Sequence, residues 1–597
     1  MAANTKNGDL VTFDVKVGGN IIPDELRVIS VLVETGVNRI PTAKIVILDG
    51  ESETGNFAAS SSDTFVPGSQ VIIEAGYDTN NQVIFQGIIT GQSLRIDDII
   101  GSTLELECRD EAIKMIVGRK CLTFSQQTDS DIISSIIGTY SGLTANVTST
   151  STAWPEQVQY YVTDWDYVLE RAEMNGMIVT ALNGKVSVAP PNSGTTSVFT
   201  VTYGDNILEF SADMDAITQL GGVTASSWYY KSQSVSTAQS SNNVPGPGNI
   251  TSQTLSEVVG LSSYQVQSTV PLEDADLTNW AQAQMIKSEY AKIRGEVLFQ
   301  GNNLVNPGNY ITLKGLGTRF NGDHIVSAVK HDLSDGNWLT TASVGLSPSW
   351  FIEEPDVLAP PASGLLSGAR GLFNGTVKQM YQDPDSQYRI LVNIPVFDPN
   401  GAGIWARLAN FYSTSGAGVF FLPEVGDEVV LGFLNEDPRY PVILGSMYSS
   451  SGNQPFNTLT PNQNNTLKAI VSKTGITIQF DDENKILTMI TPDKNQVILS
   501  DKDKQITILD DNQNSIVMSG SGITMKSQYN ITIQSDQQVS ISGAQGVSVQ
   551  ASGGDVQISG VNIKETADSQ YSAAGNSTAQ INSGMELTLK SAMIMIN

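Results

Sequence analysis

Cysteine, histidine and long apolar runs are scarce or missing in this 597-residue chain. The two cysteines, Cys108 and Cys121, are no disulfide framework, and two reduced buried thiols are expected rather than a bridge. The only histidines, His324 and His331, are too few for zinc with two distant cysteines, so we expect structural roles for them. Without a run of eighteen apolar residues or an apolar stretch in residues 1–10, neither a membrane span nor a signal peptide is expected.

Positive charge is also in short supply. The chain has 33 Lys and Arg against 61 Asp and Glu, a formal net charge of −28, which argues against nucleic acid and anionic membranes as partners. The glycine pairs at 315–317 and 416–418 are too short for a nucleotide loop, so they are interpreted as turns and no cofactor is expected.

The C-terminal part lacks bulky residues. Trp, Cys, His and Arg are absent after Arg439, and the only aromatic residues after Phe480 are Tyr529 and Tyr571. Such a segment cannot build a rounded globular core, but a thin prism needs only aliphatic side chains along its axis.

What this segment does contain is a regular spacing of apolar pairs. Two side chains two residues apart lie on one face of a strand. Pairs recur every eight residues at Ile523/Met525, Ile531/Ile533, Val539/Ile541 and Val547/Val549. Upstream they recur at roughly ten, at Ile476/Ile478, Ile486, Val497/Leu499, Ile506/Ile508 and Ile516/Met518. We expect each strand to lack a partner in its own chain, so that three copies interleave as a triple-stranded β-helix; the alternative is a disordered tail.

The first 350 residues are typical of β-structure with a few helices. Alternating strands between residues 10 and 110 predict a β-barrel. Helices are expected from Asp129, from Asp164 to Asn175 with Asp164 as N-cap, and from Leu277 to Ile293 with an end at Gly295. The polar stretch 231–249 is interpreted as a flexible loop.

The residues become diagnostic between 421 and 448. The stretches FLPEVGDEVVLGF (421–433) and EDPRYPVILGSMY (436–448) predict two strands around an acidic, proline-bounded turn, as in a small Greek-key barrel. They resemble the oligonucleotide/oligosaccharide-binding (OB) barrel of VgrG spikes and phage baseplate proteins. Gly375-Thr376-Val377 is similar to the first strand of that barrel.

The N-terminal part resembles the hub of the same family, the VgrG-type spikes of extracellular contractile injection systems. The matching segments are 65–68, 76–77, 85–89, 108–110, 161–166 and 172–177. This resemblance implies two tube-protein-like barrels per subunit, so that a trimer seats on a hexameric inner tube.

Several acidic residues could act in catalysis or ion binding, or could have structural roles instead. Glu156, Asp164 and Asp166 could form a general acid/base pair, but the two aspartates fit the start of a helix better. The acidic turns at 481–484 and 510–512 have the chemistry of calcium ligands without the spacing, and solvated turns would look the same. T-even phage spikes carry a lysozyme domain between barrel and needle, for which the connector 449–467 is too short.

The resulting prediction is a mainly β, non-enzymatic central spike. Its parts are a hub (1–355), a linker (356–370), an OB-fold barrel (371–450), a connector (451–466) and a trimeric needle (467–597). The trimer core residues are Ile523, Met525, Ile531, Ile533, Val539, Ile541, Val547 and Val549. A type VI secretion or phage baseplate spike is the alternative within this class; a trimeric adhesin and a cell-wall hydrolase are alternatives from other classes.

The expected partners follow from the resemblance. They are two further copies of the chain, the inner tube and baseplate subunits at the hub, effector cargo, and transiently the target membrane, with assembly in the bacterial cytoplasm. Apolar register weakens in the polar stretch 565–578 and resumes at Met585/Leu587/Leu589. The strand edges and apolar side chains at the end of the needle need a cover, and the family supplies a PAAR-type tip protein. Met593, Ile594, Met595 and Ile596 are its expected docking platform.

Overall fold

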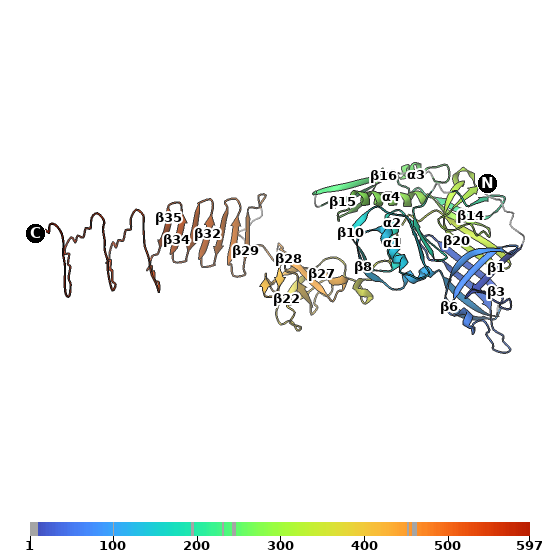
Figure 1. Ribbon diagram of the computed structural model, residues 1–597, viewed down its shortest axis with the longest axis horizontal. Helices are drawn as coiled ribbons and strands as arrows, with labels where there is room; N and C mark the ends of the chain where they lie inside the picture. The colour runs from blue at the N-terminus through green and yellow to red at the C-terminus, as the bar shows by residue number, and fades with distance from the viewer. Residues whose placement is uncertain are drawn as a thin grey trace. The chain divides into compact units, whose positions relative to one another are not determined.

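The computed structural model describes residues 10–99, 101–192, 196–229, 232–241, 246–450, 453–456 and 462–596. It divides into two compact units, Met1–Met447 and Tyr448–Asn597, and each is described here by itself (Figure 1). The described residues are mainly β-structure with a few helices, which confirms the predicted fold class. No helix in these ranges is long and apolar enough to cross a membrane.

One thirteen-stranded sheet organises the hub. Its main path is β14 (Ile207–Met214), β18 (Ile293–Gln300), β21 (Asn337–Val344), β20 (Gly322–Ser334), β3 (Val28–Gly36), β4 (Thr42–Leu48), β7 (Gly101–Arg109), β6 (Asn80–Asp97), β5 (Gln70–Tyr77), β1 (Val11–Val17) and β2 (Asn20–Ile21). Strands β13 (Phe199–Thr202) and β19 (Tyr310–Lys314) attach through β20. Where the resemblance implied two barrels, the described hub has one continuous sheet whose two halves join where β20 pairs with β3.

Each half of the sheet has its own core. One core packs Val31, Ile45, Ile73, Phe85 and Leu106 from the strands before residue 110. The other packs residues of β13, β18, β19, β20 and β21, such as Val201, Phe299 and Val326. Alternate burial along these strands matches the period of two in the sequence, because neighbouring side chains point to opposite faces.

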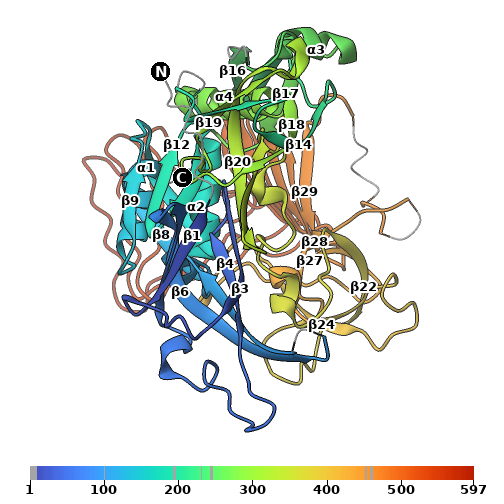
Figure 2. The same cartoon turned by 90° about the vertical axis from the view of Figure 1, so that its right-hand side faces the viewer.

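Helices and small sheets complete the hub. The helices are α1 (Asp129–Gly138), α2 (Asp164–Met174), α3 (Ser252–Val259), α4 (Asp274–Tyr290) and α5 (Gly317–Phe320). The small sheets are β8 (Lys120–Thr128) with β10 (Ala153–Val162), β9 (Thr144–Val147) with β11 (Ile178–Leu182) and β12 (Lys185–Ala189), and β15 (Gly222–Tyr229) with β16 (Ser234–Ser241) and β17 (Tyr264–Ser268). Figure 2 shows α1 and α2 beside β9 and β12, where they cover a third core.

Helix ends differ from the prediction in two places. Thr163, not Asp164, caps α2, because the Thr163 hydroxyl accepts the backbone N–H of Asp166 and leaves Asp164 in the first turn. Helix α4 begins at Asp274 and ends before Ile293, which instead starts β18 by pairing with Met214. Gly295 lies inside that strand, where an added Cβ would be 2.2 Å from the Ser211 carbonyl oxygen.

The polar stretch predicted as a loop contains a strand. Residues 234–241 form β16, which pairs along the whole length of β15. Tertiary pairing here overrides the Ser-rich composition, because β16 covers an edge of β15 that would otherwise be unpaired. Of the other residues in that prediction, 232–233 and 246–249 are described and form no strand, whereas 231 and 242–245 lie outside the described ranges.

A closed barrel follows in the same unit. Its order is β22 (Phe373–Gln379), β23 (Ile390–Asn393), β24 (Ile404–Leu408), β28 (Pro441–Ser446) and β27 (Glu428–Phe433). Val377, Val392, Ala406 and Leu431 are among its fully buried residues. A short hairpin, β25 (Ser413–Thr414) with β26 (Ala417–Gly418), leaves Phe411, Phe420 and Phe421 exposed around it.

The second unit begins with a row of seven short antiparallel strands (Figure 1). They are β29 (Leu467–Val471), β30 (Thr477–Asp481), β31 (Ile486–Ile490), β32 (Gln496–Ser500), β33 (Gln505–Leu509), β34 (Ser515–Ser519) and β35 (Gly522–Lys526). We call these strands the ladder. The chain then continues from 527 to 596 without regular strands in that range, and we call this part the distal segment.

Candidate functional site

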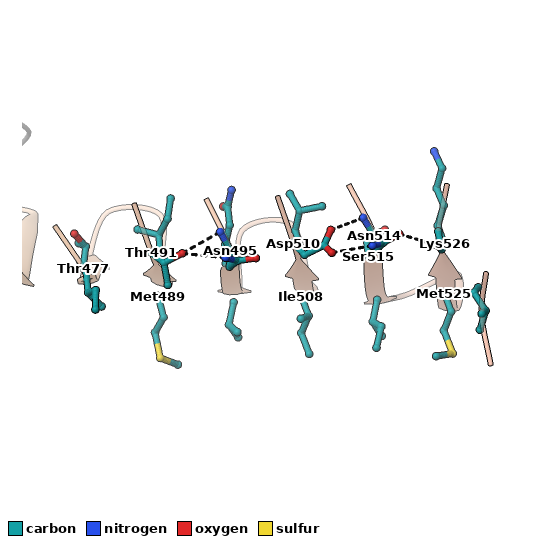
Figure 3. Close-up of a pocket in the computed structure, with 18 of the residues that line it drawn as sticks. Thr477, Met489, Thr491, Asn495, Ile508, Asp510, Asn514, Ser515, Met525 and Lys526 are labelled. Atoms are coloured by element: carbon teal, nitrogen blue, oxygen red, sulfur yellow. Dashed lines mark hydrogen bonds between the residues drawn. The ribbon is translucent and has the colours of Figure 1, made fainter. Parts of the chain in front are cut away.

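Two straight rows of apolar side chains cross one face of the ladder. Residues that lie directly opposite one another on neighbouring strands form each row. The first row is Ile470, Ile478, Met489, Val497, Ile508, Ile516 and Met525. The second row begins with the charged Lys468 and continues with the apolar residues Phe480, Leu487, Leu499, Ile506, Met518 and Ile523. Met489, Ile508 and Met525 point to the same side of the sheet in Figure 3.

These rows are open to solvent. Met489 is 40% exposed and Ile508 43%, although each lies between apolar neighbours on the adjoining strands, and Met525 on the last strand is 54% exposed. A groove of about 740 Å³ runs along the first row from Ile476 to Ile531. A continuous apolar face of this length is a mark of an interaction surface, since single soluble chains rarely leave one uncovered.

The pairing corrects the sequence register upstream of residue 500. Strand β31 places Leu487 and Met489 on the apolar face, whereas the predicted Ile486 lies on the opposite face. Strand β30 likewise contributes Ile478 with Phe480, and Ile476 precedes the strand. The ten-residue spacing also proves to be half of a nineteen-residue repeat of two strands. Ser472, Thr491 and Asp510 begin equivalent loops nineteen residues apart.

Each of these equivalent loops is closed in the same way. The side-chain oxygens of Ser472, Thr491 and Asp510 accept backbone N–H groups four residues on, at 3.0, 3.2 and 2.7 Å. Lys494 and Gln513 immediately precede Asn495 and Asn514, whose backbone N–H groups donate these hydrogen bonds. Both have left-handed backbone, with φ of 67° and 65°. These loops reverse the chain, so the ladder's strands pair within the chain, and the expectation that each strand lacks a partner in its own chain is wrong for residues 467–526.

Two acidic turns use their carboxylates for this closure. Asp481 accepts the backbone and side-chain N–H groups of Asn484 at 3.0 and 2.8 Å, and Asp510 accepts those of Asn514 at 2.7 and 2.8 Å. The hydrogen bonds from these asparagine side chains lower the pKa of both carboxyls. Within the described ranges, no three His, Cys, Asp or Glu residues are grouped to hold a metal ion.

The distal segment differs from the ladder in its backbone. Bends fall at 528–529, 536–537, 544–545, 552–554, 561, 568–569, 576–577, 584–585 and 592. Between bends the chain is extended, and no backbone–backbone hydrogen bond joins two residues of the range 527–596. Extended backbone of this kind cannot be buried from water or be stable by itself, because every N–H and C=O group needs a hydrogen-bond partner.

The predicted core residues divide between these two parts. Ile523 and Met525 lie on β35 and end the two rows of the ladder. The other six, from Ile531 to Val549, lie in the distal segment and are all exposed. Whether they meet around a common axis depends on further copies of the chain, so the trimer core stays a prediction.

The bends correct the prediction of an irregular stretch at 565–578. Apart from an offset at 561, the bends keep the interval of eight through this stretch, although apolar side chains become rare in it. A signal for this was present in the sequence. Every eighth residue from 527 is small: Ser527, Ser535, Gly543, Ala551, Ser559, Ala567, Gly575, Ser583 and Ser591. At Gly543 and Gly575 an added Cβ would lie 2.3 and 2.4 Å from a carbonyl oxygen across the bend.

The proposed docking residues at the end of the chain are fully accessible. Met593 is 74% exposed, Met595 78% and Ile596 88%. The spacing of eight puts Met595 in phase with Ile531 and Leu587, whereas Ile594 and Ile596 fall on alternate positions that, apart from Val556, carry glycine or polar residues elsewhere in the segment. Apolar side chains therefore occupy both faces at this end.

The hub carboxylates considered for catalysis serve structural contacts. Asp164 is 2% exposed and accepts hydrogen bonds from Lys120 and Tyr140 at 2.6 Å and from Gln159 at 2.9 Å. Burial by itself would raise the pKa of Asp164, but these three hydrogen bonds outweigh it and hold the pKa below its usual value. The structure does not bring Glu156 into this cluster; it lies in β10 opposite Ser125.

Both histidines are buried in the hub. The imidazole of His331 lies 3.0 Å from the Thr340 hydroxyl and beside the ring of Trp338, and burial lowers its pKa to about 4. His324 lies 2.8 Å from the Phe320 carbonyl oxygen, and burial lowers its pKa to about 4 as well. Cys108 is buried and Cys121 exposed, both as free thiols, so the expectation of two buried thiols is wrong for Cys121.

Two known domain families match this chain. The Alg8 N-terminal domain family matches residues 7–335, more than half of the chain, and the chain belongs to this family. The type VI secretion system/phage-baseplate injector OB domain matches residues 373–448, the span of the closed barrel.

One curated relative is the type VI secretion system spike protein VgrG3 of Vibrio cholerae serotype O1, which is 38% identical over 52 residues. That match covers 9% of this chain and 5% of VgrG3, so the chain aligns with only a small part of its relative. The OB-domain and VgrG3 matches confirm the resemblance to VgrG-type spikes. They support a structural role in a spike of the type VI secretion or phage-baseplate class.

Solved structures with some similarity are tail and secretion proteins. The 43 kDa tail protein of prophage MuSo2 from Shewanella oneidensis is 12% identical, with a TM-score of 0.43, over 57% of this chain and 98% of that one. An E. coli component of the type VI secretion system is 13% identical, with a TM-score of 0.38, over 72% and 99%. The Francisella PdpA–VgrG complex is 9% identical, with a TM-score of 0.35, over 87% and 80%.

Proposed function

We propose that the chain is the non-enzymatic central spike of a contractile injection system. Three copies form the spike, the hub adapts a hexameric inner tube to the trimer, and the needle punctures the target envelope when a sheath contracts. In this proposal the particle assembles in the bacterial cytoplasm, and effector cargo travels with the spike.

The distal segment is the observation that supports this proposal most directly. Its extended backbone lacks internal partners, its apolar side chains recur on one face every eight residues, and the same chain contains a barrel that matches the injector OB domain. Interleaving with two further copies would satisfy the N–H and C=O groups and cover the apolar face in one step. The open apolar rows of the ladder support assembly in the same way.

Light scattering on the purified full-length chain tests the trimer. One copy has a mass of 63.9 kDa, and the proposal requires a particle of three copies. A stable monomer would contradict the proposal, because the distal segment would then have to tolerate its exposed backbone.

The absence of enzymatic activity has its own test. Burial raises the pKa of Glu170 to about 7, which makes it the first hub carboxyl to examine for acid/base chemistry. We expect no clearing on a peptidoglycan zymogram from the wild-type protein or from Glu170→Gln. Clearing that this substitution abolishes would favour the hydrolase alternative instead.

The end of the needle is proposed to bind a PAAR-type tip protein through Met593, Ile594, Met595 and Ile596. These residues would leave an exposed apolar surface at the end of a trimer, and such surfaces are aggregation hazards. Deleting residues 592–597 should leave the trimer intact and abolish co-purification of the tip protein. Retention of the tip protein by the shortened chain would move the docking site elsewhere.

A further inference from the structure

One small sheet of the hub carries no charge. Strands β15, β16 and β17 form a three-stranded sheet in the order β16-β15-β17, and none of their residues is charged. The chain as a whole has a formal net charge of −28. Charged residues usually cover the surface of a soluble protein, so an uncharged surface sheet in so acidic a chain points to contact with a partner.

One face of this sheet is open. Helix α4 covers the other face, where it packs against residues such as Val223 and Ala225 (Figure 1). The open face carries rows of residues that lie directly opposite one another on neighbouring strands. The rows are Thr224 with Gln239 and Gln265, Ser226 with Thr237 and Gln267, and Trp228 with Val235. In the last row Trp228 is 41% exposed and Val235 59%.

Both edges of the sheet are open as well. Strands β16 and β17 each pair with β15 alone, so in the described part of the chain no strand lies against their outer N–H and C=O groups. The edge strands of the large hub sheet differ, because β14 carries Glu209 and Asp213 and β1 carries Asp14 and Lys16. Charged side chains on an edge strand discourage pairing with another chain. Strands β16 and β17 lack this protection.

We propose that β16 of one copy pairs with β17 of the next copy, so that three hubs close into a ring through this sheet. The partner is a second copy of this chain, and the inference rests on the trimer proposed above. Each contact uses two different edges, and each copy supplies both.

The charge of the chain favours a second copy as the partner. Identical copies of a strongly acidic chain repel one another wherever their Asp and Glu residues face each other, and such like-charge contacts are costly. At an uncharged sheet the copies can approach without that cost. Adding a strand to an open edge then contributes main-chain hydrogen bonds across the contact.

Threefold symmetry decides which edges meet. Two copies of β16 that pair with each other are related by a twofold axis, and such a contact ends at a dimer. A closed ring of three copies needs two different surfaces in every contact. The opposite edges of one sheet, β16 and β17, are such a pair.

Cross-linking between two singly substituted chains tests this pairing. Gln239→Cys places a thiol on the open face of β16, and Gln265→Cys places one on the same face of β17. Both chains also carry Cys121→Ser, and Cys108 is buried, which raises the pKa of its thiol to about 12 and keeps it unreactive. Co-expression of the two chains gives mixed trimers. A short bis-maleimide should join the two kinds of chain into a covalent dimer.

Trimers of one kind of chain are the first control. Neighbouring strands lie about 4.8 Å apart, whereas two copies of β16 in the proposed ring are three strands apart, about 14 Å. Trimers that contain only Gln239→Cys chains should therefore give no covalent dimer with the short reagent. A dimer from these trimers would show that β16 edges face each other, and it would overturn the pairing.

A cysteine elsewhere on the hub is the second control. Asn80→Cys lies at the exposed turn between β5 and β6 and should give no dimer with Gln265→Cys. The pairing is wrong if mixed trimers with Gln239→Cys give no dimer, or give no more than this control. Light scattering on the same chains checks the trimer separately, and a monomer would contradict the proposed spike together with the pairing.

Discussion

The ladder and the distal segment carry similar apolar pairs, yet their hydrogen-bond partners differ. In the ladder, loops such as 472–476 and 491–495 are long enough to reverse the chain, and each strand pairs with the next. In the distal segment, bends such as 536–537 and 544–545 only turn a corner, and the next stretch runs on without pairing to the last. Whether the connection reverses the chain, not the apolar pattern, decides whether a strand pairs with the next strand of its own chain, and even the two-residue turn 520–521 reverses it between β34 and β35.

The largest expected effect comes from a charge on the inner face of the distal segment. Ile531→Asp removes a side chain whose burial is worth about 1.5–3 kcal/mol in each copy, and it adds three carboxylates near one axis. We expect trimer assembly to fail while the ladder keeps its β-structure, as measured by light scattering and circular dichroism. Thr532→Asp at the neighbouring outward position is the control and should assemble normally.

A charge in the ladder should have a smaller effect. Met489→Asp disturbs the first row, but the in-chain pairing of β30, β31 and β32 remains. We therefore expect a weakened trimer with a lower melting temperature rather than a monomer. If Met489→Asp and Ile531→Asp weaken the trimer equally, pairing within the chain does not protect the ladder against a charge on its apolar face.

Acidification should change the stability of the hub and leave that of the needle unchanged. His324 and His331 have pKa values lowered from 6.5 to about 4 by burial, so the unfolded chain binds their protons more tightly than the folded hub. The stability that the two histidines contribute should be complete above pH 6.5 and fall as the pH drops from 6.5 to 4, by at most about 1.4 kcal/mol per pH unit for each histidine. Glu170, whose pKa burial raises to about 7, acts in the opposite direction because the folded hub binds its proton more tightly, so the net slope is smaller. The needle contains no histidine, and its melting should stay constant over this window. His331→Gln should reduce the slope of the hub transition in calorimetry.

The smallest effect is expected at a loop of the ladder. Asp510→Ala removes two hydrogen bonds from Asn514 at an exposed turn, so we expect only a small loss of stability. Amide exchange should speed up in β33 and β34 and remain unchanged in β29. Asp511→Ala, in the same loop, is the control.

Much of the fold follows from local patterns. The strands before residue 110, the start of α1 and the strands around the Pro-bounded turn of the barrel agree with simple periodicity and capping rules. The failures have specific causes. Strand β16 needed its partner β15 to be recognised, and the end of α4 was set by the pairing of Ile293 with Met214. The sequence pattern alone does not show the nineteen-residue repeat, because Ile486 stands beside Leu487 and Met489 in the sequence but lies on the other face of the strand.

The sequence carries the needle register beyond its last regular apolar pair. Apolar pairs alone suggested irregularity after Ile563, but the small residues at every eighth position carry the same count through to Ser591. The interactions between copies could not be predicted in detail, because a period of eight is compatible with any shift by one repeat.

The missing hydrogen-bond partners of the distal segment also bear on how the protein is made. A ribosome releases the hub and the barrel before the needle, and these contain their own cores. Once three such parts associate, the three unfinished needles are tethered at one point, and their effective concentration rises to a level that dilute chains in a cell do not reach. Translation order would then spare each distal segment a search for its partners among unrelated proteins.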